Sequence, residues 1–218
     1  MNQPITYHDY VIKNGKFVGD FEGLYLNHPD PWRQDQIANR ESTVKFITTL
    51  WCNRLKVLHD ARKTMELGCG FGYLTESLRL DGFDSTGMDT SSTAIAKAKL
   101  LNPKSNFIEG SISDFDLIKS ADPDIVIMAE VTWYILDELD ALFENFKQMS
   151  RARQSSLYVI HLLTTYAPGV QEYGTEKFTN LSEILEYFDL NYLESGLIQA
   201  GGENSNSSQA TYFVAKID

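Results

Sequence analysis

The sequence predicts an α/β protein, with a seven-stranded, mostly parallel sheet, helices on both faces and an antiparallel last strand. Short apolar segments alternate with segments whose apolar residues recur every three or four positions, which is typical of strands alternating with helices. The last two apolar segments have no helix between them, so they must pair antiparallel or form a long hairpin. A chain of 218 residues is long enough to bury a sizeable core in a single domain.

The N-terminal part is expected to hold a turn followed by a long helix. Pro29 and Pro31 bar a helix at their own positions and favour a turn. Asp30 is a fair N-cap, with Pro31 at the first helical position. Apolar residues at three- and four-residue steps then predict an amphipathic helix, unbroken or broken once, from Trp32 to about Leu58.

Residues 61–218 form the expected core, and residues 1–60 an N-terminal segment with the long helix. Strands are predicted at 64–67, 84–88, 106–109, 124–129, 157–163, 192–199 and 211–217, and helices at 73–80, 91–101, 136–150 and 181–188. Ser91 or Ser92 is the expected N-cap of the second of these helices, and Asn180 that of the last.

Composition and charge exclude several classes of protein. With 43% hydrophobic residues, 14 glycines and 6 prolines, the chain is neither disordered nor collagenous. The formal net charge of −11 and the lack of a basic stripe argue against nucleic acid as a partner and favour cationic ligands such as a sulfonium or an amine. No signal peptide and no apolar run of membrane-spanning length are found, and two cysteines make no disulfide framework. A cytoplasmic protein without a membrane partner is expected.

The most informative segment is a glycine-rich turn after the first core strand, at residues 66–72 (Glu-Leu-Gly-Cys-Gly-Phe-Gly). Alternating glycines between a strand and a helix let the backbone approach a ligand closely. A dinucleotide-binding loop has the form G-x-G-x-x-G, and Gly68 and Gly70 fit it, but position 73 is Tyr. Tyr73 therefore argues against the alternative of a nicotinamide-dependent oxidoreductase.

The Glu-x-Gly-x-Gly-x-Gly pattern resembles motif I of class I S-adenosylmethionine-dependent methyltransferases, whose loop lies against the methionine part of the cofactor. The resemblance covers residues 62–165 and implies a Rossmann-like class I methyltransferase fold. It implies S-adenosyl-L-methionine as cofactor and S-adenosyl-L-homocysteine as product. The cofactor contacts that it implies on this loop are Glu66, Gly68, Cys69 (through its backbone), Gly70 and Gly72.

Further landmarks of this family follow along the chain. Asp89 ends the second strand about twenty residues after Gly68, where an acid can accept both ribose hydroxyls; the alternative is a simple helix N-cap. Residues 107–115 resemble the third-strand motif that flanks the adenine, with Ser111 where an acid is commonest, so that the adenine contact passes to Ser111 or Asp114. The implied contacts at these strand ends are Asp89, Thr90, Ser111, Ile112, Glu130 and Val131.

The fourth-strand motif, residues 123–131, bears on the methyl acceptor. It lacks the Asn/Asp-Pro-Pro-Tyr of DNA adenine and amide methylases. Glu130 followed by the aromatic pair Trp133-Tyr134 resembles nodulation-factor N-methyltransferases, which act on an amino sugar, and so does the Asp-Pro-Trp at 30–32. The pattern over residues 10–22 resembles methyltransferases encoded with polysaccharide genes. Both resemblances imply a small amine- or sugar-bearing acceptor, and they imply that the N-terminal segment, residues 1–60, folds over the cofactor as a lid.

An amine must lose its proton before it attacks, and a carboxylate can hold the ammonium and take that proton. Glu130, Tyr134 and His161 are the expected catalytic residues; for His161 the alternative is an ordinary core histidine. O-methylation of a sugar or small acid is the alternative reaction, with His161 or His8 as the base. The expected walls of the acceptor site, by cation–π contact or merely by packing, are Tyr7, Tyr10, Tyr25, Trp32, Trp133 and Tyr134.

One further possibility stays open at this point. A domain that binds the cofactor without turnover, as a sensor or partner subunit, has the same motif I. The four histidines, at 8, 28, 59 and 161, show no metal-ligand spacing, so no metal is expected. The chain is expected to be a monomer or a homodimer.

Overall fold

The fold is described by a computed structural model, which covers residues 8–36, 42–167, 169–171, 173–198 and 208–218. The strands of the central sheet are β3 (Lys63–Leu67), β4 (Asp84–Asp89), β5 (Asn106–Glu109), β6 (Ile125–Ala129), β7 (Leu157–Tyr166), β8 (Asn191–Ile198) and β9 (Ser208–Ile217). Their order is β5-β4-β3-β6-β7-β9-β8. The first five are parallel, and β9 pairs antiparallel with both β7 and β8, which confirms the predicted fold class.

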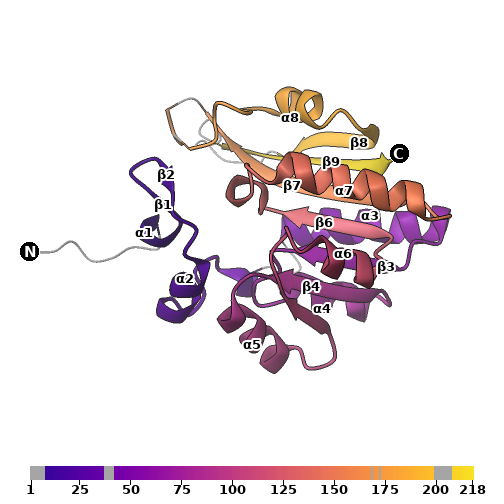
Figure 1. Ribbon diagram of the computed structural model, residues 1–218, viewed down its shortest axis with the longest axis horizontal. Coiled ribbons are helices and arrows are strands. Elements are labelled where there is room, and N and C mark those ends of the chain that lie inside the picture. The colour runs from indigo at the N-terminus through magenta and orange to yellow at the C-terminus, as the bar shows by residue number, and fades with distance from the viewer. Residues whose placement is uncertain (1–7, 37–41, 168, 172, 199–207) are drawn as a thin grey trace, which may run out of the picture.

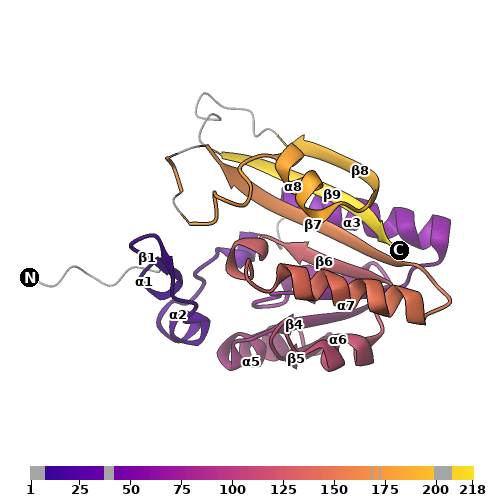
Figure 2. The ribbon, with the colours of Figure 1, turned by 45° about the horizontal axis from the view of Figure 1, so that its top comes forward.

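Helices cover both faces of this sheet (Figures 1 and 2). The helices α3 (Thr43–His59), α4 (Tyr73–Leu80) and α5 (Ser92–Leu101) lie on one face, and α6 (Phe115–Ala121), α7 (Leu139–Ala152) and α8 (Leu181–Phe188) on the other. Because neighbouring residues of a strand point to opposite faces, Ile127 packs toward α3 while Met128 packs toward α7. Burial on both faces is the reason that β6 is apolar at every position.

Local signals set most of the element boundaries. The hydroxyl of Ser91 accepts the N–H of Ala94 at 3.0 Å and caps α5, and the side chain of Asn180 caps α8, both as predicted. Helix α7 begins three residues later than expected because a 3-10 turn, η2 (Thr132–Tyr134), occupies the chain after β6. Helix α6, of only seven residues, was not predicted.

The N-terminal part differs from the predicted turn and long helix. It contains α1 (His8–Val11), the hairpin strands β1 (Ile12–Lys13) and β2 (Lys16–Phe17), α2 (Phe21–Asn27) and the 3-10 helix η1 (Gln34–Gln36). Helix α3 begins at Thr43, with Ser42 as its N-cap, so the prediction of a helix from Trp32 was wrong in its first part. Asp30 instead accepts the N–H groups of Gln34 and Asp35, at 2.8 and 3.0 Å, and caps η1.

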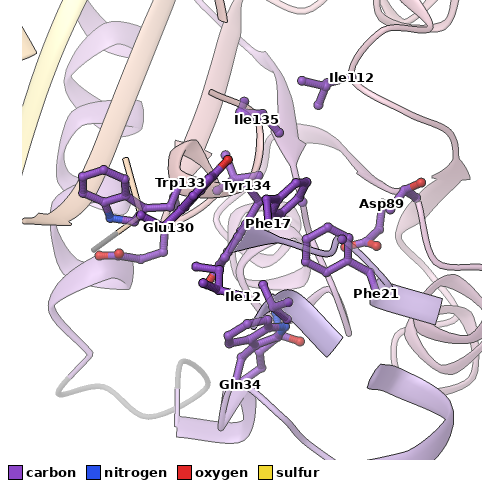
Figure 3. A pocket seen from close by; sticks show the side chains of 18 of the residues that line it. Ile12, Phe17, Phe21, Gln34, Asp89, Ile112, Glu130, Trp133, Tyr134 and Ile135 are labelled. Carbon is purple, nitrogen blue, oxygen red and sulfur yellow. The ribbon is translucent and has the colours of Figure 1, made fainter. Parts of the chain in front are cut away.

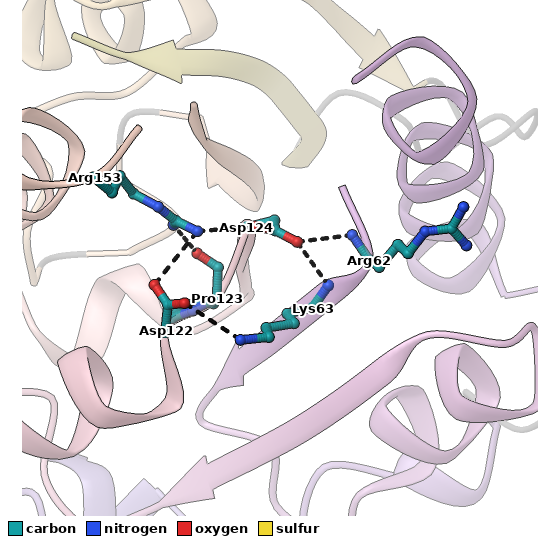
Figure 4. A network of polar contacts seen from close by, with 6 residues as sticks. All are labelled: Arg62, Lys63, Asp122, Pro123, Asp124 and Arg153. Atoms are coloured by element: carbon teal, nitrogen blue, oxygen red, sulfur yellow. Dashed lines mark hydrogen bonds and ion pairs between the residues drawn. The ribbon is translucent and has the colours of Figure 1, made fainter. Parts of the chain in front are cut away.

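An ionic network joins the amino ends of β3 and β6 to the end of α7 (Figure 4). The carboxylate of Asp124 accepts the N–H groups of Arg62 and Lys63, at 2.8 and 3.0 Å, and pairs with Arg153 at 2.8 Å. Arg153 also contacts the carbonyl of Pro123 and pairs with Asp122 at 3.4 Å. The network therefore fixes the end of the sheet opposite to the carboxyl ends of the parallel strands.

The N-terminal elements lie beyond those carboxyl ends (Figure 1). Helix α2 packs against α5, so the start of the chain contacts the core from outside the sheet. Among the described helices, none has both the length and the apolar character that crossing a membrane requires.

Candidate active site

A pocket of about 1160 Å³ opens at the carboxyl ends of β3, β4 and β6 (Figure 3). The chain runs outward from β3 to β5 and then returns to β6, so the strand order reverses between β3 and β6. Ligands of open α/β sheets bind at such a reversal. In Figure 3, Glu130 and Trp133 lie on one side of the pocket and Asp89 on the other, with Phe17 and Phe21 of the N-terminal part between them.

The glycine loop after β3 reaches this pocket at Gly68. Gly68, Gly70 and Gly72 have φ values of 71°, 52° and 75°, a conformation that other residues rarely adopt. A Cβ atom would lie 2.8 Å from the Val131 side chain at Gly68 and 2.2 Å from the Phe107 ring at Gly72. The loop therefore requires glycine for both backbone conformation and space.

The glycines differ in their relation to the pocket. Gly68 lines it, whereas Gly70, Gly72 and Cys69 lie outside its lining and shape the loop from behind. At Gly70 a Cβ would meet the side-chain amide of Gln34 at 2.2 Å, because the N-terminal part packs closely there.

Asp89, at the end of β4, is held in place by backbone donors. Its Oδ2 accepts the N–H of Gly70 at 2.8 Å, and its Oδ1 accepts the N–H of Ser91 at 2.9 Å. Burial raises the pKa of its carboxyl, and the backbone hydrogen bonds oppose that effect. Each carboxylate oxygen keeps a second lone pair, so Asp89 can fix the loop and still accept hydroxyls from a ligand in the pocket that it lines.

Glu66 is a buried carboxyl group on the same side of the sheet. Its Oε2 accepts the hydroxyl of Thr75, and it lines the pocket. Burial raises the pKa of Glu66 to about 8; the hydrogen bond from Thr75 opposes this rise, and the charge of Asp89 adds to it. A cation that enters the pocket stabilises the ionised form of such a carboxyl group, so the two attract each other.

Glu130 follows β6 with φ of 59°, which is costly for a side chain of this type. Its carboxylate accepts the N–H and the hydroxyl of Thr164, on the neighbouring strand β7, at 2.9 and 3.0 Å. Its own N–H donates to the carbonyl of Leu162 at 2.9 Å. Burial raises the pKa of this carboxyl, and the contacts with Thr164 oppose the rise.

Four of the six aromatic residues that the sequence pointed to line the pocket: Tyr25, Trp32, Trp133 and Tyr134. The Tyr134 ring lies 5.4 Å, between centroids, from the rings of both Phe21 and Trp32. Tyr10 lies outside the lining, edge-on to His28 at 5.6 Å. Tyr7 lies outside the described residues.

The structure does not bring His161 to the pocket. Strand β7 continues to Tyr166, so His161 lies within the strand and not at its end. The ring is fully buried, stacks on Phe213 at 4.5 Å and contacts the Thr132 hydroxyl through Nε2 at 2.7 Å. Burial lowers its pKa to about 3. The expected base is thus a core histidine, and the side chain of His8 lies outside what the structure describes.

The remaining predicted residues, Thr90, Ser111, Ile112 and Val131, all line the pocket. Residues of the N-terminal part that were not predicted also line the pocket, among them Phe17, Phe21, Arg33 and Gln34. The Oε1 atom of Gln34 accepts the N–H of Phe71 at 2.9 Å, a contact between positions 37 residues apart. No periodicity or motif marks such a residue in advance.

Glu22, which was not predicted as a functional residue either, ties α2 to the start of α5. Its carboxylate accepts the Ser91 hydroxyl at 2.6 Å, and the N–H and hydroxyl of Thr93 at 3.2 and 2.5 Å. These hydrogen bonds, that from Ser91 first, lower the pKa of Glu22 to about 2. The N-terminal part is therefore attached to the core beside Asp89.

Comparison with known proteins agrees with this geometry. Residues 65–154 match a family described as a methyltransferase domain. The chain accordingly contains a methyltransferase domain of the class I fold, and is an enzyme that uses S-adenosylmethionine. No curated protein sequence matches the chain.

Solved structures with this fold include two named methyltransferases and WbdD. N-methyltransferase NodS from Bradyrhizobium japonicum, in complex with S-adenosyl-L-homocysteine, is 16% identical with a TM-score of 0.60, over 89% of this chain and 96% of that one. A TehB-like S-adenosylmethionine-dependent methyltransferase from Corynebacterium glutamicum has the same identity and TM-score, over 90% and 99%. WbdD is 20% identical with a TM-score of 0.57, over 87% of this chain and 43% of its own. At such identities the likeness shows the fold.

The residues of the pocket fit this cofactor. At Gly68 the glycine loop presents backbone without a side chain to the pocket, and Glu66 and Asp89 offer carboxylates to a ligand that carries an amino group and ribose hydroxyls. When bound, the cofactor supplies a methyl group on a sulfonium that is already activated for transfer. The protein has to hold the acceptor in line with that methyl group and exclude water.

Proposed function

We propose that the enzyme methylates the nitrogen of a small amine, such as an amino sugar, without a metal ion. One observation supports this proposal above the others: Glu130 lines the pocket in a strained conformation that Thr164 holds through two hydrogen bonds. Strain of this kind is found where a side chain must be placed for a ligand.

Glu130 has the properties that an amine acceptor requires. A protonated amine has no lone pair, so it must be held and deprotonated before it can react. A partly buried carboxylate with a raised pKa attracts an ammonium and is basic enough to accept its proton. The rings of Tyr134 and Trp32 give the cation an aromatic wall.

The alternative of O-methylation receives less support from the site. A hydroxyl acceptor usually needs a histidine or lysine base or a metal, and His161 is buried in the core on β7 with a lowered pKa. For the described residues, Glu130 is then the group best placed to move a proton.

The lid role of residues 1–60 also belongs to the proposal. Glu22 and Gln34 attach the described N-terminal elements to α5 and to the glycine loop, and Phe17 and Phe21 close the pocket from that side. We further expect the enzyme to work in the cytoplasm as a monomer or homodimer. The net charge of −11 supports a partner other than nucleic acid.

The test is turnover with a panel of amino sugars and small amines at saturating S-adenosylmethionine, with S-adenosylhomocysteine release as the signal. Once an acceptor is found, Glu130→Gln should lower kcat about 100-fold or more, the usual contribution of a general base. Binding of S-adenosylhomocysteine by calorimetry should change far less. Full turnover by Glu130→Gln at saturating acceptor would show that the carboxylate has no such role, and cofactor binding without turnover of any acceptor would favour a sensor.

A further inference from the structure

Backbone strain singles out two pocket residues. Four of the six described non-glycine residues with positive φ are of the types that tolerate it: Asn14, Asp60, Asp122 and Asp189. Three of these are helix C-caps and the other lies in the β1–β2 turn. The remaining two are Arg33, with φ of 51°, and Glu130, and both line the pocket. A long charged residue gains nothing intrinsic from this conformation, so its surroundings must impose it.

Asp30 and Gln34 hold Arg33 in this conformation. The Asp30 carbonyl accepts the N–H of Arg33 at 3.2 Å, while the Asp30 carboxylate caps the two residues that follow. Gln34 is fixed in turn by the N–H of Phe71 on the glycine loop. The turn is therefore anchored on both sides, and it presents the exposed side chain of Arg33 at the pocket.

The charge around Arg33 is one-sided. The described lining contains four acids, Glu66, Asp89, Glu130 and Glu138, and Arg33 as its single lysine or arginine. No described acid lies within ion-pair distance of its guanidinium, although the whole chain carries an excess of acids. The planar guanidinium binds a carboxylate through two parallel hydrogen bonds.

We propose that Arg33 is a carboxylate-binding residue of this pocket, an inference that rests on the proposed methyltransferase function. Two ligands can supply the carboxylate. Arg33 adjoins Gln34, which contacts the glycine loop, and this position favours the amino-acid end of the cofactor. Arg33 also adjoins Trp32, which packs on Tyr134 beyond Glu130, and this position favours an acceptor that carries both an amine and a carboxylate.

The test compares the wild type with Arg33→Asn and Arg33→Lys. Asparagine is neutral and tolerates a positive φ, so Arg33→Asn removes the charge without adding backbone strain. Lysine keeps the charge but loses the two-pronged geometry. Lys16→Asn is the matched control, because Lys16 is an exposed cation of the same N-terminal part that lies outside the pocket lining.

Calorimetry on the full chain with two nucleosides identifies a cofactor carboxylate. S-adenosylhomocysteine contains the carboxylate, and 5′-methylthioadenosine lacks the amino-acid part. If the cofactor is the source, Arg33→Asn weakens binding of S-adenosylhomocysteine about 10- to 100-fold and changes the affinity for 5′-methylthioadenosine by less than about twofold. The Arg33→Lys variant should lose less affinity for S-adenosylhomocysteine than Arg33→Asn does. Lys16→Asn should change neither affinity by more than twofold.

Glucosamine and glucosaminic acid, titrated into protein loaded with S-adenosylhomocysteine, identify an acceptor carboxylate. In that case Arg33→Asn leaves the affinity for both nucleosides unchanged and weakens only the binding of glucosaminic acid, by about tenfold or more. Equal weakening of both nucleosides, or no effect of Arg33→Asn in either experiment, would overturn the proposal while leaving the methyltransferase function intact. Failure of the wild type to bind either nucleoside would contradict that function itself.

Discussion

The raised pKa of Glu66 predicts that removing its charge stabilises the free enzyme. Between the ordinary value of 4.5 and the folded value of about 8, the folded state binds more protons than the unfolded state. Stability therefore falls as pH rises through this window, by about 1.4 kcal/mol for each pH unit. At pH 5 the penalty is below about 1 kcal/mol, and at pH 7 it reaches about 3 kcal/mol.

Glu66→Gln should abolish this penalty, because glutamine is uncharged and keeps an oxygen that can accept the Thr75 hydroxyl. In urea unfolding followed at both pH values, the stability of Glu66→Gln relative to the wild type should increase by about 2.5 kcal/mol from pH 5 to pH 7. Binding of S-adenosylmethionine should weaken at the same time, since the variant offers the cation no carboxylate at this position.

Glu76→Gln is the matched control on α4. The hydrogen bond from Arg79 lowers the pKa of Glu76 most. Burial opposes this effect, and a hydrogen bond from Ser105 adds to it, so Glu76 is ionised in both the folded and the unfolded state across this pH range. Its effect on stability should be the same at pH 5 and pH 7. An equal shift in relative stability for both variants, or no pH dependence in Glu66→Gln, would refute the reasoning about burial.

Two further predictions concern opposite ends of the sheet. Asp89→Ala should weaken S-adenosylhomocysteine binding by about 1–3 kcal/mol, through lost hydrogen bonds to a charged group, and an unchanged dissociation constant would remove Asp89 from the site. Asp124→Ala should lower the free energy of unfolding by about 2–4 kcal/mol, because Arg153, whose side chain is 13% exposed, and two backbone donors lose their partner. The affinity of Asp124→Ala for S-adenosylhomocysteine should stay unchanged. The control is Glu144→Ala, at an exposed position, which should alter the free energy of unfolding by less than about 0.5 kcal/mol. Equal losses of stability in the two variants would argue against a stabilising role of the network.

The N-terminal part is attached to the core by hydrogen bonds between residues that lie far apart in the sequence. Glu22 reaches Thr93 over 71 residues and Gln34 reaches Phe71 over 37. Both contacts meet the core where Asp89 and the glycine loop meet the pocket. The contacts that position the N-terminal part therefore lie beside the residues of the cofactor site. A change in one is expected to affect the other, as the proposed lid role requires.

The sequence by itself determined the elements whose causes are local. Glycine is needed wherever a positive φ and a close approach coincide, so the loop at Gly68 and Gly72 was identifiable from spacing. Ser91 and Asn180 cap helices through N–H groups three residues away, and the doubly covered β6 is apolar throughout. The fold class follows from such signals. The cofactor class followed from the resemblance of the glycine loop to motif I, and most of the predicted strand-end residues line the pocket.

Only the tertiary structure decided which side chains share the pocket. His161 was expected at a strand end, but β7 extends to Tyr166 and turns the ring into the core against Phe213. The helix expected from Trp32 yielded to a turn fixed by Asp30, and that turn places Arg33 at the pocket. Strand length and long-range packing settle these placements, and neither leaves a periodic mark in the sequence.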